Sequence, residues 1–260
     1  MDRGTNHGAL YGKGLRTLSI ATLLSLAAAV ALIFFYAPIE EDQGIIQKIF
    51  YVHVPLAIVA LGGFVAGGLF AIKYLRSEDR SWDARSYVAI HLAIVFALGA
   101  LITGSIWAKA SWGHWWEWNE PVLVSFLIVF LLYCCYQPLR FSIEDPERQA
   151  RYASVFAIVA GAFIPINFIA VRLAHSFVHP RVLSDTGGNL PGQMFLTFLV
   201  ALAGVALLFA TLWKLELTSK SASEKLARLR RSLEAEDVEA RPAAGAPAPP
   251  VSAAPARPVA

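Results

Sequence analysis

The segment Trp112-Gly-His-Trp-Trp-Glu-Trp118, followed by Asn119, Glu120 and Pro121, places four tryptophans within seven residues. It stands between two long apolar runs, so the sequence predicts that it lies at a membrane surface. Tryptophan is enriched where an apolar region meets water, and a few indoles are enough to anchor a helix end there. If the segment is helical, its indoles lie within about half of the helix circumference. This density favours a platform for a large, flat aromatic ligand over an anchor alone.

The composition excludes most soluble classes. Of the 260 residues, 57% are apolar and 16% are charged, which is outside the usual range of a soluble domain. The formal charge of +3 is small and dispersed, so nucleic acid is not an expected partner. The two cysteines, Cys134 and Cys135, are adjacent and exclude a disulfide framework or a CxxC redox pair. The first apolar run is too long for a signal-peptide core, and we expect it to be retained.

Six apolar runs are long enough to cross a bilayer. We expect spans at about residues 17–37, 49–75, 87–107, 122–139, 152–171 and 191–213. In the second span, four glycines should permit close helix contacts: Gly62, Gly63, Gly67 and Gly68. The sequence thus predicts an all-α polytopic membrane protein with six transmembrane helices.

Basic residues predict the orientation. The N-terminal segment (1–16) and the turns after the second and fourth spans are rich in Lys and Arg, whereas the opposite links hold few. By the positive-inside rule, both termini are cytoplasmic and the tryptophan-rich segment 107–121 faces outward. The membrane domain covers 17–215. Residues 216–260 then predict a charged cytoplasmic helix and a disordered tail rich in Pro and Ala.

Histidines supply the candidate ligands. His53 lies near the outer end of the second span, and His175 and His179 lie just beyond the fifth. Imidazole ligates iron, zinc or copper without a net charge, which suits the edge of a bilayer. His175 and His179, four residues apart, could also form a zinc pair, but no HExxH pattern accompanies them. Histidines in two outer links beside an aromatic platform indicate a haem site. His91, near the cytoplasmic end of the third span, is left outside it.

The stretch Thr103-Gly-Ser-Ile-Trp-Ala-Lys-Ala-Ser-Trp-Gly-His-Trp-Trp-Glu-Trp118 resembles the tryptophan-rich signature of the cytochrome c assembly family of haem-handling membrane proteins, which includes CcmC, CcmF and CcsA. The six-span CcmC branch is the most similar. That family places the motif between the third and fourth spans on the outer face, with one histidine in each flanking outer link. Tyr51-Val-His-Val-Pro55 matches the first link, and His179 before Pro180 matches the second, with His175 as its rival. Asn119 stands where the signature usually has Asp.

The resemblance implies haem b bound at the outer face of the bacterial inner membrane and passed to a periplasmic haem chaperone (CcmE-like) during cytochrome c maturation. This is a handling role and not an enzymatic one. His53 and His179 would be axial ligands of the haem iron, and Lys109 and Arg172 would pair with the propionates. The porphyrin platform would comprise Trp112, Trp115, Trp116 and Trp118. Further partners would be separate chains: an ABC-type ATP-binding subunit, its membrane subunit and a small membrane subunit.

Two alternatives remain open from the sequence. One is a haem-translocating cytochrome c synthetase of the same family, although that type generally has more spans. The other is a small-solute transporter with an ordinary aromatic belt. Charged residues within spans would favour transport, and they are almost absent here.

Overall fold

The structure is a computed structural model that describes residues 14–173, 179 and 190–240. Within the helices, side chains are not described at residues 166, 167, 170–172 and 236–240. The disordered tail predicted for residues 241–260 and most of the N-terminal segment therefore lie outside the described residues. The chain divides into two units, residues 1–218 and residues 219–260, and the first unit carries the candidate site.

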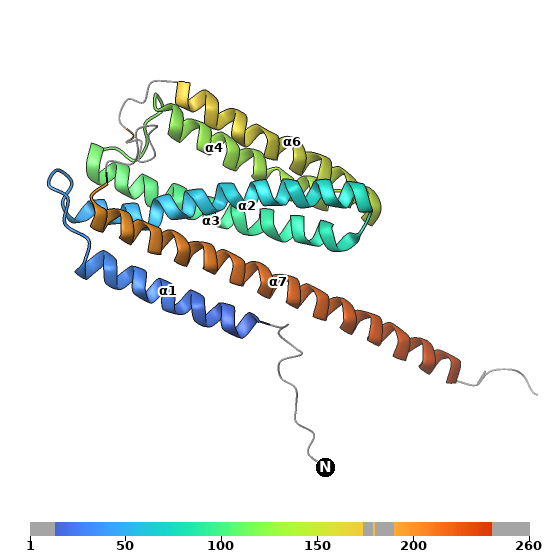
Figure 1. The fold of residues 1–260 in the computed structure, drawn as a ribbon. Helices are drawn as coiled ribbons and strands as arrows, with labels where there is room; N and C mark the ends of the chain where they lie inside the picture. The colour runs from blue at the N-terminus through green and yellow to red at the C-terminus, as the bar shows by residue number, and fades with distance from the viewer. Residues whose placement is uncertain (1–13, 174–178, 180–189, 241–260) are drawn as a thin grey trace, which may run out of the picture. The chain divides into compact units, whose positions relative to one another are not determined.

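All regular secondary structure in the described part is helical, apart from an isolated β-bridge between Glu40 and Gly44. In chain order the helices are α1 (Leu15–Phe35), the 3-10 helix η2 (Ile45–Ile49), α2 (Phe50–Ser77), α3 (Arg80–Trp112), α4 (Pro121–Cys134), α5 (Tyr136–Phe141), α6 (Pro146–Leu173) and α7 (Gly192–Ala240) (Figure 1). The predicted all-α fold is confirmed.

Each expected span coincides with one helix, except the fourth, which comprises α4 and α5. Five helical stretches among the described residues are long and apolar enough to cross a membrane: Leu15–Phe35, Ile45–Ser77, Arg80–Trp112, Pro121–Phe141 and Gly192–Ala235. The helix α6, with 28 residues, covers the expected fifth span. Large apolar side chains on these helices are exposed, among them Leu23, Leu24, Phe35, Val159 and Phe195. Lipid tails suit such faces and water does not, so the chain is a multi-pass membrane protein.

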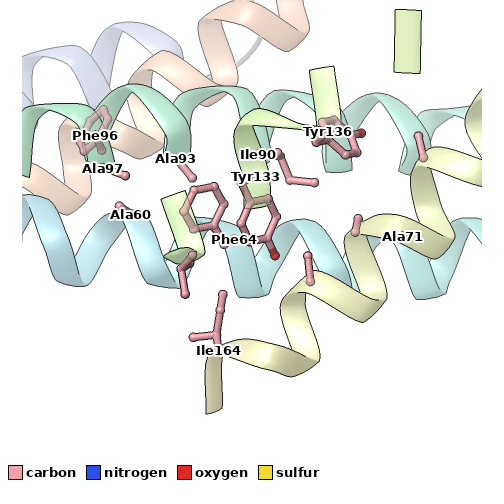
Figure 2. Close-up of a cluster of buried hydrophobic side chains, with 14 of the residues drawn as sticks. Ala60, Phe64, Ala71, Ile90, Ala93, Phe96, Ala97, Tyr133, Tyr136 and Ile164 are labelled. Atoms are coloured by element: carbon pink, nitrogen blue, oxygen red, sulfur yellow. The ribbon is translucent and has the colours of Figure 1, made fainter. Parts of the chain in front are cut away.

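The main core lies where α2 packs against α3, α4 and α6 (Figure 2). At its centre the ring of Phe64 stacks on that of Tyr133, with centroids 3.7 Å apart and planes inclined by 10°. Small side chains surround this pair, including Ala60, Ala93 and Ala157, all fully buried. Because lipid supplies no hydrophobic drive between helices, such close packing of small and aromatic groups holds the spans together.

Glycines in α2 allow the close approach predicted from the sequence. An added Cβ would lie 2.5 Å from Ile90 Cγ1 at Gly67, and 3.2 Å from a carbonyl oxygen of α6 at Gly68. Gly63 is equally tight against a ring of α7, at 2.7 Å. Gly62 differs, since an added Cβ there meets nothing within 4 Å. Three of the four glycines therefore serve helix packing.

The helices present two contrasting ends. At the first, which we call the turn end (residues 78–85 and 140–146), the α2–α3 turn lies beside the α5–α6 turn, because Arg80 Nη1 donates to the carbonyl of Pro146 at 2.6 Å. Here Asp79 caps α3 by accepting from the backbone N–H of Ser81 at 2.8 Å, which lowers the pKa of its carboxyl. The second, which we call the tryptophan end, comprises residues 36–53, 103–121 and 179.

Candidate functional site

The tryptophan segment is only partly helical. The helix α3 continues through Trp112 and ends at Gly113, whose φ of 80° is the left-handed conformation typical of a helix C-terminus. The Gly113 N–H donates to the carbonyl of Lys109 at 3.2 Å. Residues 113–120 are then irregular, until Pro121 begins α4 at the position where proline is favoured. The helical arrangement of all four indoles on one face is therefore wrong, because glycine ends the helix after the first.

The indoles differ in their surroundings. Trp115 and Trp118 are 59% and 71% exposed, which is unusual for such large apolar groups. Trp116 is half-buried and contacts Trp118 edge to face, with centroids 6.0 Å apart. Its Nε1 is buried and has no hydrogen-bond partner among the described residues. The ring of Trp112 instead faces that of His114, with centroids 6.3 Å apart. The irregular segment thus offers exposed indole faces to a ligand or to lipid.

His53 is held in one orientation by α3. Its Nδ1 lies 2.9 Å from the carbonyl oxygen of Ala100 and 3.4 Å from the hydroxyl of Thr103. Since a carbonyl only accepts, Nδ1 carries the proton and donates, and Nε2 keeps its lone pair. This is the arrangement by which proteins orient a metal-ligating histidine. Among the described residues, none hydrogen-bonds to Nε2.

A glycine makes room for the His53 ring. An added Cβ at Gly104 would lie 2.6 Å from His53 Cε1, closer than real Cβ atoms approach. On its other side, the ring meets the edge of Trp107 at a centroid distance of 5.9 Å. Trp107 is in turn fixed, because its Nε1 donates to Gln43 Oε1 at 2.7 Å. Thr103, Gly104 and Trp107, from the Thr-Gly-Ser-Ile-Trp part of the signature, therefore contact the His53 ring directly, and we call these three residues the seat of His53.

The second outer histidine reaches the same end of the helices. The backbone N–H of His179 donates to Glu120 Oε2 at 3.2 Å, which ties it to the start of α4. His179 is half-buried. Its rival, His175, lies outside the described residues. The contact with Glu120 places the backbone of His179 at the same end of the helices as His53.

The remaining sequence candidates are less informative. Lys109 is exposed, and its Nζ donates to the carbonyl of Gly113 at 2.7 Å, so its charge lies beside the tryptophan segment. Arg172 is in the last turn of α6, and its side chain is not described. His91 lies away from this end, with its Nδ1 3.2 Å from Gln137 Nε2 and its ring stacked with Tyr87.

Sequence reasoning missed three contributors. Glu120 is fully buried, although in the sequence it was singled out only as one of the residues that follow the tryptophans. Ala100 and Gly104 contact His53, but neither carries a functional group that would single it out. The available signal was positional, since both lie within one helical turn of Thr103 in the signature.

Two comparisons with known proteins agree. The family model described as "Heme exporter protein C" (CcmC) matches residues 3–232. The protein named heme exporter protein C from Rhodobacter capsulatus is 30% identical over 222 residues, which cover 85% of this chain and 91% of that protein. The protein of the same name from Paracoccus denitrificans is 30% identical over 75% of this chain and 81% of that protein. The one from Escherichia coli K12 is also 30% identical, over 60% of this chain and 63% of that protein. A match over most of the sequence shows the family: this chain belongs to the heme exporter protein C family.

Proposed function

We propose that this protein binds haem b at the outer face of the bacterial inner membrane and delivers it to a periplasmic haem chaperone during cytochrome c maturation. In this proposal His53 and His179 are the axial ligands of the iron. The relatives are named for haem export, which supports haem as the cargo. The role is binding and transfer, without a chemical reaction on the haem by this chain.

One observation carries the proposal: the hydrogen bond from His53 Nδ1 to the Ala100 carbonyl at 2.9 Å. A haem iron accepts a neutral imidazole through a nitrogen lone pair. The Ala100 bond fixes the tautomer that leaves this lone pair on Nε2, and Gly104 and Trp107 set the plane of the ring. An interfacial histidine that served only as an anchor would not need such a seat.

The surroundings fit a porphyrin. Its large apolar faces need aromatic or aliphatic contact, and Trp115 and Trp118 hold exposed indoles at the same end of the helices. Its propionates need cations or donors at the polar edge. Lys109 is exposed beside the tryptophan segment, and Arg172 is in the last described turn of α6. Bound haem would supply an iron with two axial positions, which the two histidines would fill.

We further propose that energy-coupling partners are other chains. The sequence holds no complete GxxxxGK[ST] loop, because Gly12-Lys13 is followed by Gly14 and preceded by a glycine at the wrong spacing. An ABC-type ATP-binding subunit, its membrane subunit and a small membrane subunit would therefore be recruited alongside the chaperone. The inner membrane and the periplasmic position of the site are part of the same proposal.

The visible absorption spectrum of the detergent-purified protein tests the site. Wild type should show a low-spin spectrum typical of two imidazole ligands. His53→Ala and His179→Ala should each lower haem retention, on the order of tenfold to a hundredfold or more, and change the spectrum. The matched control is His91→Ala, which should keep the haem retention and the spectrum of wild type.

Two outcomes would change the proposal. If His175→Ala reproduces the loss and His179→Ala is silent, the second ligand is His175. If wild type binds no haem above the level of His53→Ala, the haem site is wrong and the small-solute transporter returns as the leading alternative.

A further inference from the structure

Glu120 is a buried carboxyl group at a functional end of the molecule. It is 0% exposed and stands immediately before α4, in extended conformation at φ −88° and ψ 106°. A carboxylate removed from water needs polar partners, and buried carboxylates without a role are uncommon near a membrane. Its Oε2 accepts the backbone N–H of His179 at 3.2 Å. The chemistry proposed above does not use this group.

The backbone around Glu120 is fixed by a local turn. Its N–H donates to the carbonyl of Glu117 at 3.3 Å, and its own carbonyl accepts from Val124 at 3.1 Å. The carboxylate of Glu117 accepts the N–H of Asn119 at 2.9 Å. These bonds tie Glu120 to Glu117, in the turn that contains Trp118, and to the first turn of α4. A group bound to Glu120 is therefore held in register with the tryptophan segment.

The contact engages the backbone of His179 and leaves its imidazole out of this bond. His53, in contrast, is held through its ring by the Ala100 carbonyl. His53 lies on a helix that already fixes its backbone, so only its ring needs a partner. Residue 179 is itself a bend and lies in none of the described helices. A hydrogen bond to its backbone N–H therefore fixes the position of the main chain there.

We propose that Glu120 is a positioning residue that fastens His179 to the tryptophan segment and so holds the second ligand at the same end of the helices as His53. This inference rests on the proposed function, because it assigns His179 as the ligand to be placed. The hydrogen-bond acceptor on the side chain is the required feature. Glu120→Gln keeps an amide oxygen that can accept the same N–H, whereas Glu120→Leu keeps the approximate size and removes the acceptor.

The first measurement is hydrogen exchange in haem-free protein. The peptide that contains His179 should exchange faster in Glu120→Leu, by about tenfold or more, because the protecting acceptor is gone. Glu120→Gln should exchange like wild type. The matched control is Glu41→Leu, the same change at an exposed carboxylate of the tryptophan end. Unchanged exchange in Glu120→Leu would overturn the proposal.

The second measurement is the spectrum of haem-loaded protein. Glu120→Leu should shift from the low-spin form toward a high-spin form with one protein ligand, and free imidazole should restore the low-spin form. Glu120→Gln should resemble wild type, and a Gln variant that behaves like Leu would refute an acceptor role. If wild type itself binds no haem, the proposed function fails, while the exchange result still decides whether Glu120 anchors residue 179.

Discussion

The turn end and the tryptophan end of the helices handle polar groups in opposite ways. At the turn end, Asp83 and Arg140 are both buried and are joined by two hydrogen bonds of 2.7 Å. The guanidinium also lies 5.0 Å from the ring centre of Tyr87. At the tryptophan end, Trp115 and Trp118 are exposed, and His53 Nε2 has no partner among the described residues.

The contrast separates structure from function. A buried charge pair with bidentate geometry is complete within the chain, and it needs nothing from outside. Exposed indoles and an oriented imidazole at one end of the helices can both gain free energy when a ligand covers them. Substitutions at the turn end should therefore affect folding, and those at the tryptophan end should affect ligand binding.

The largest expected effect is at the turn end. Asp83→Ala leaves the Arg140 guanidinium buried without its carboxylate, which typically destabilises a protein by about 3–5 kcal/mol. We expect a marked fall in membrane yield and in the thermal stability of the purified protein, measured by intrinsic fluorescence.

The matched control for this pair removes both charges. Asp83→Leu combined with Arg140→Met should recover most of the stability, because a buried ion pair can be replaced by apolar groups of similar size. A single Asp83→Ala variant as stable as wild type would show that the pair is not the structural element we infer.

A smaller effect, confined to binding, is expected at the tryptophan end. Trp115→Ala combined with Trp116→Ala removes two indoles, each contributing about 0.5–1.5 kcal/mol beyond area burial, so haem affinity should fall on the order of tenfold to a hundredfold. Span insertion should persist, since the long apolar runs that carry it are unchanged. Membrane yield and haem absorbance per protein are measured beside those of His53→Ala.

The same two positions distinguish a platform from an anchor. A double change to Tyr preserves an amphipathic ring at headgroup level, so it should support insertion but restore haem only in part. Near-normal haem content in a well-inserted double Ala variant would reduce the segment to an interfacial anchor.

A third prediction addresses the seat of His53. Gly104→Ala places a methyl group 2.6 Å from His53 Cε1, so the ring must move. Displacing a ligand that a neighbour orients costs about tenfold in affinity, and haem retention should fall by that amount without loss of protein. Gly62→Ala is the control, because its methyl group meets nothing within 4 Å. Equal haem retention in the two variants would contradict the inference that Gly104 is needed to make room for the His53 ring.

The sequence predicted the spans well and the site only in outline. Apolar length alone located six helices, because the thickness of the bilayer sets that length. The sequence also allowed a helix that continues through Trp118, but in the structure this helix ends at Gly113. An isolated glycine within a helical pattern is only a weak signal of a helix end. His53 was chosen for its residue type, but the carbonyl of Ala100 that orients it is a backbone group. Such groups are brought near only by packing, and no motif marks them.

The last prediction changes the protein least and decides which way the two ends face. The basic turns predict that the turn end is cytoplasmic and that the tryptophan end faces outward. With Cys134 and Cys135 replaced by Ala, Ser111→Cys provides a single exposed thiol at the tryptophan end, and Ser142→Cys provides one at the turn end. A membrane-impermeant thiol reagent should label Ser111→Cys in cells whose outer membrane is permeable to it, and should label Ser142→Cys only after lysis. Neither substitution touches the core, so haem content should match that of the cysteine-free parent. The reverse labelling pattern would place the tryptophan end in the cytoplasm, and delivery of haem to a periplasmic chaperone from this site would then be excluded.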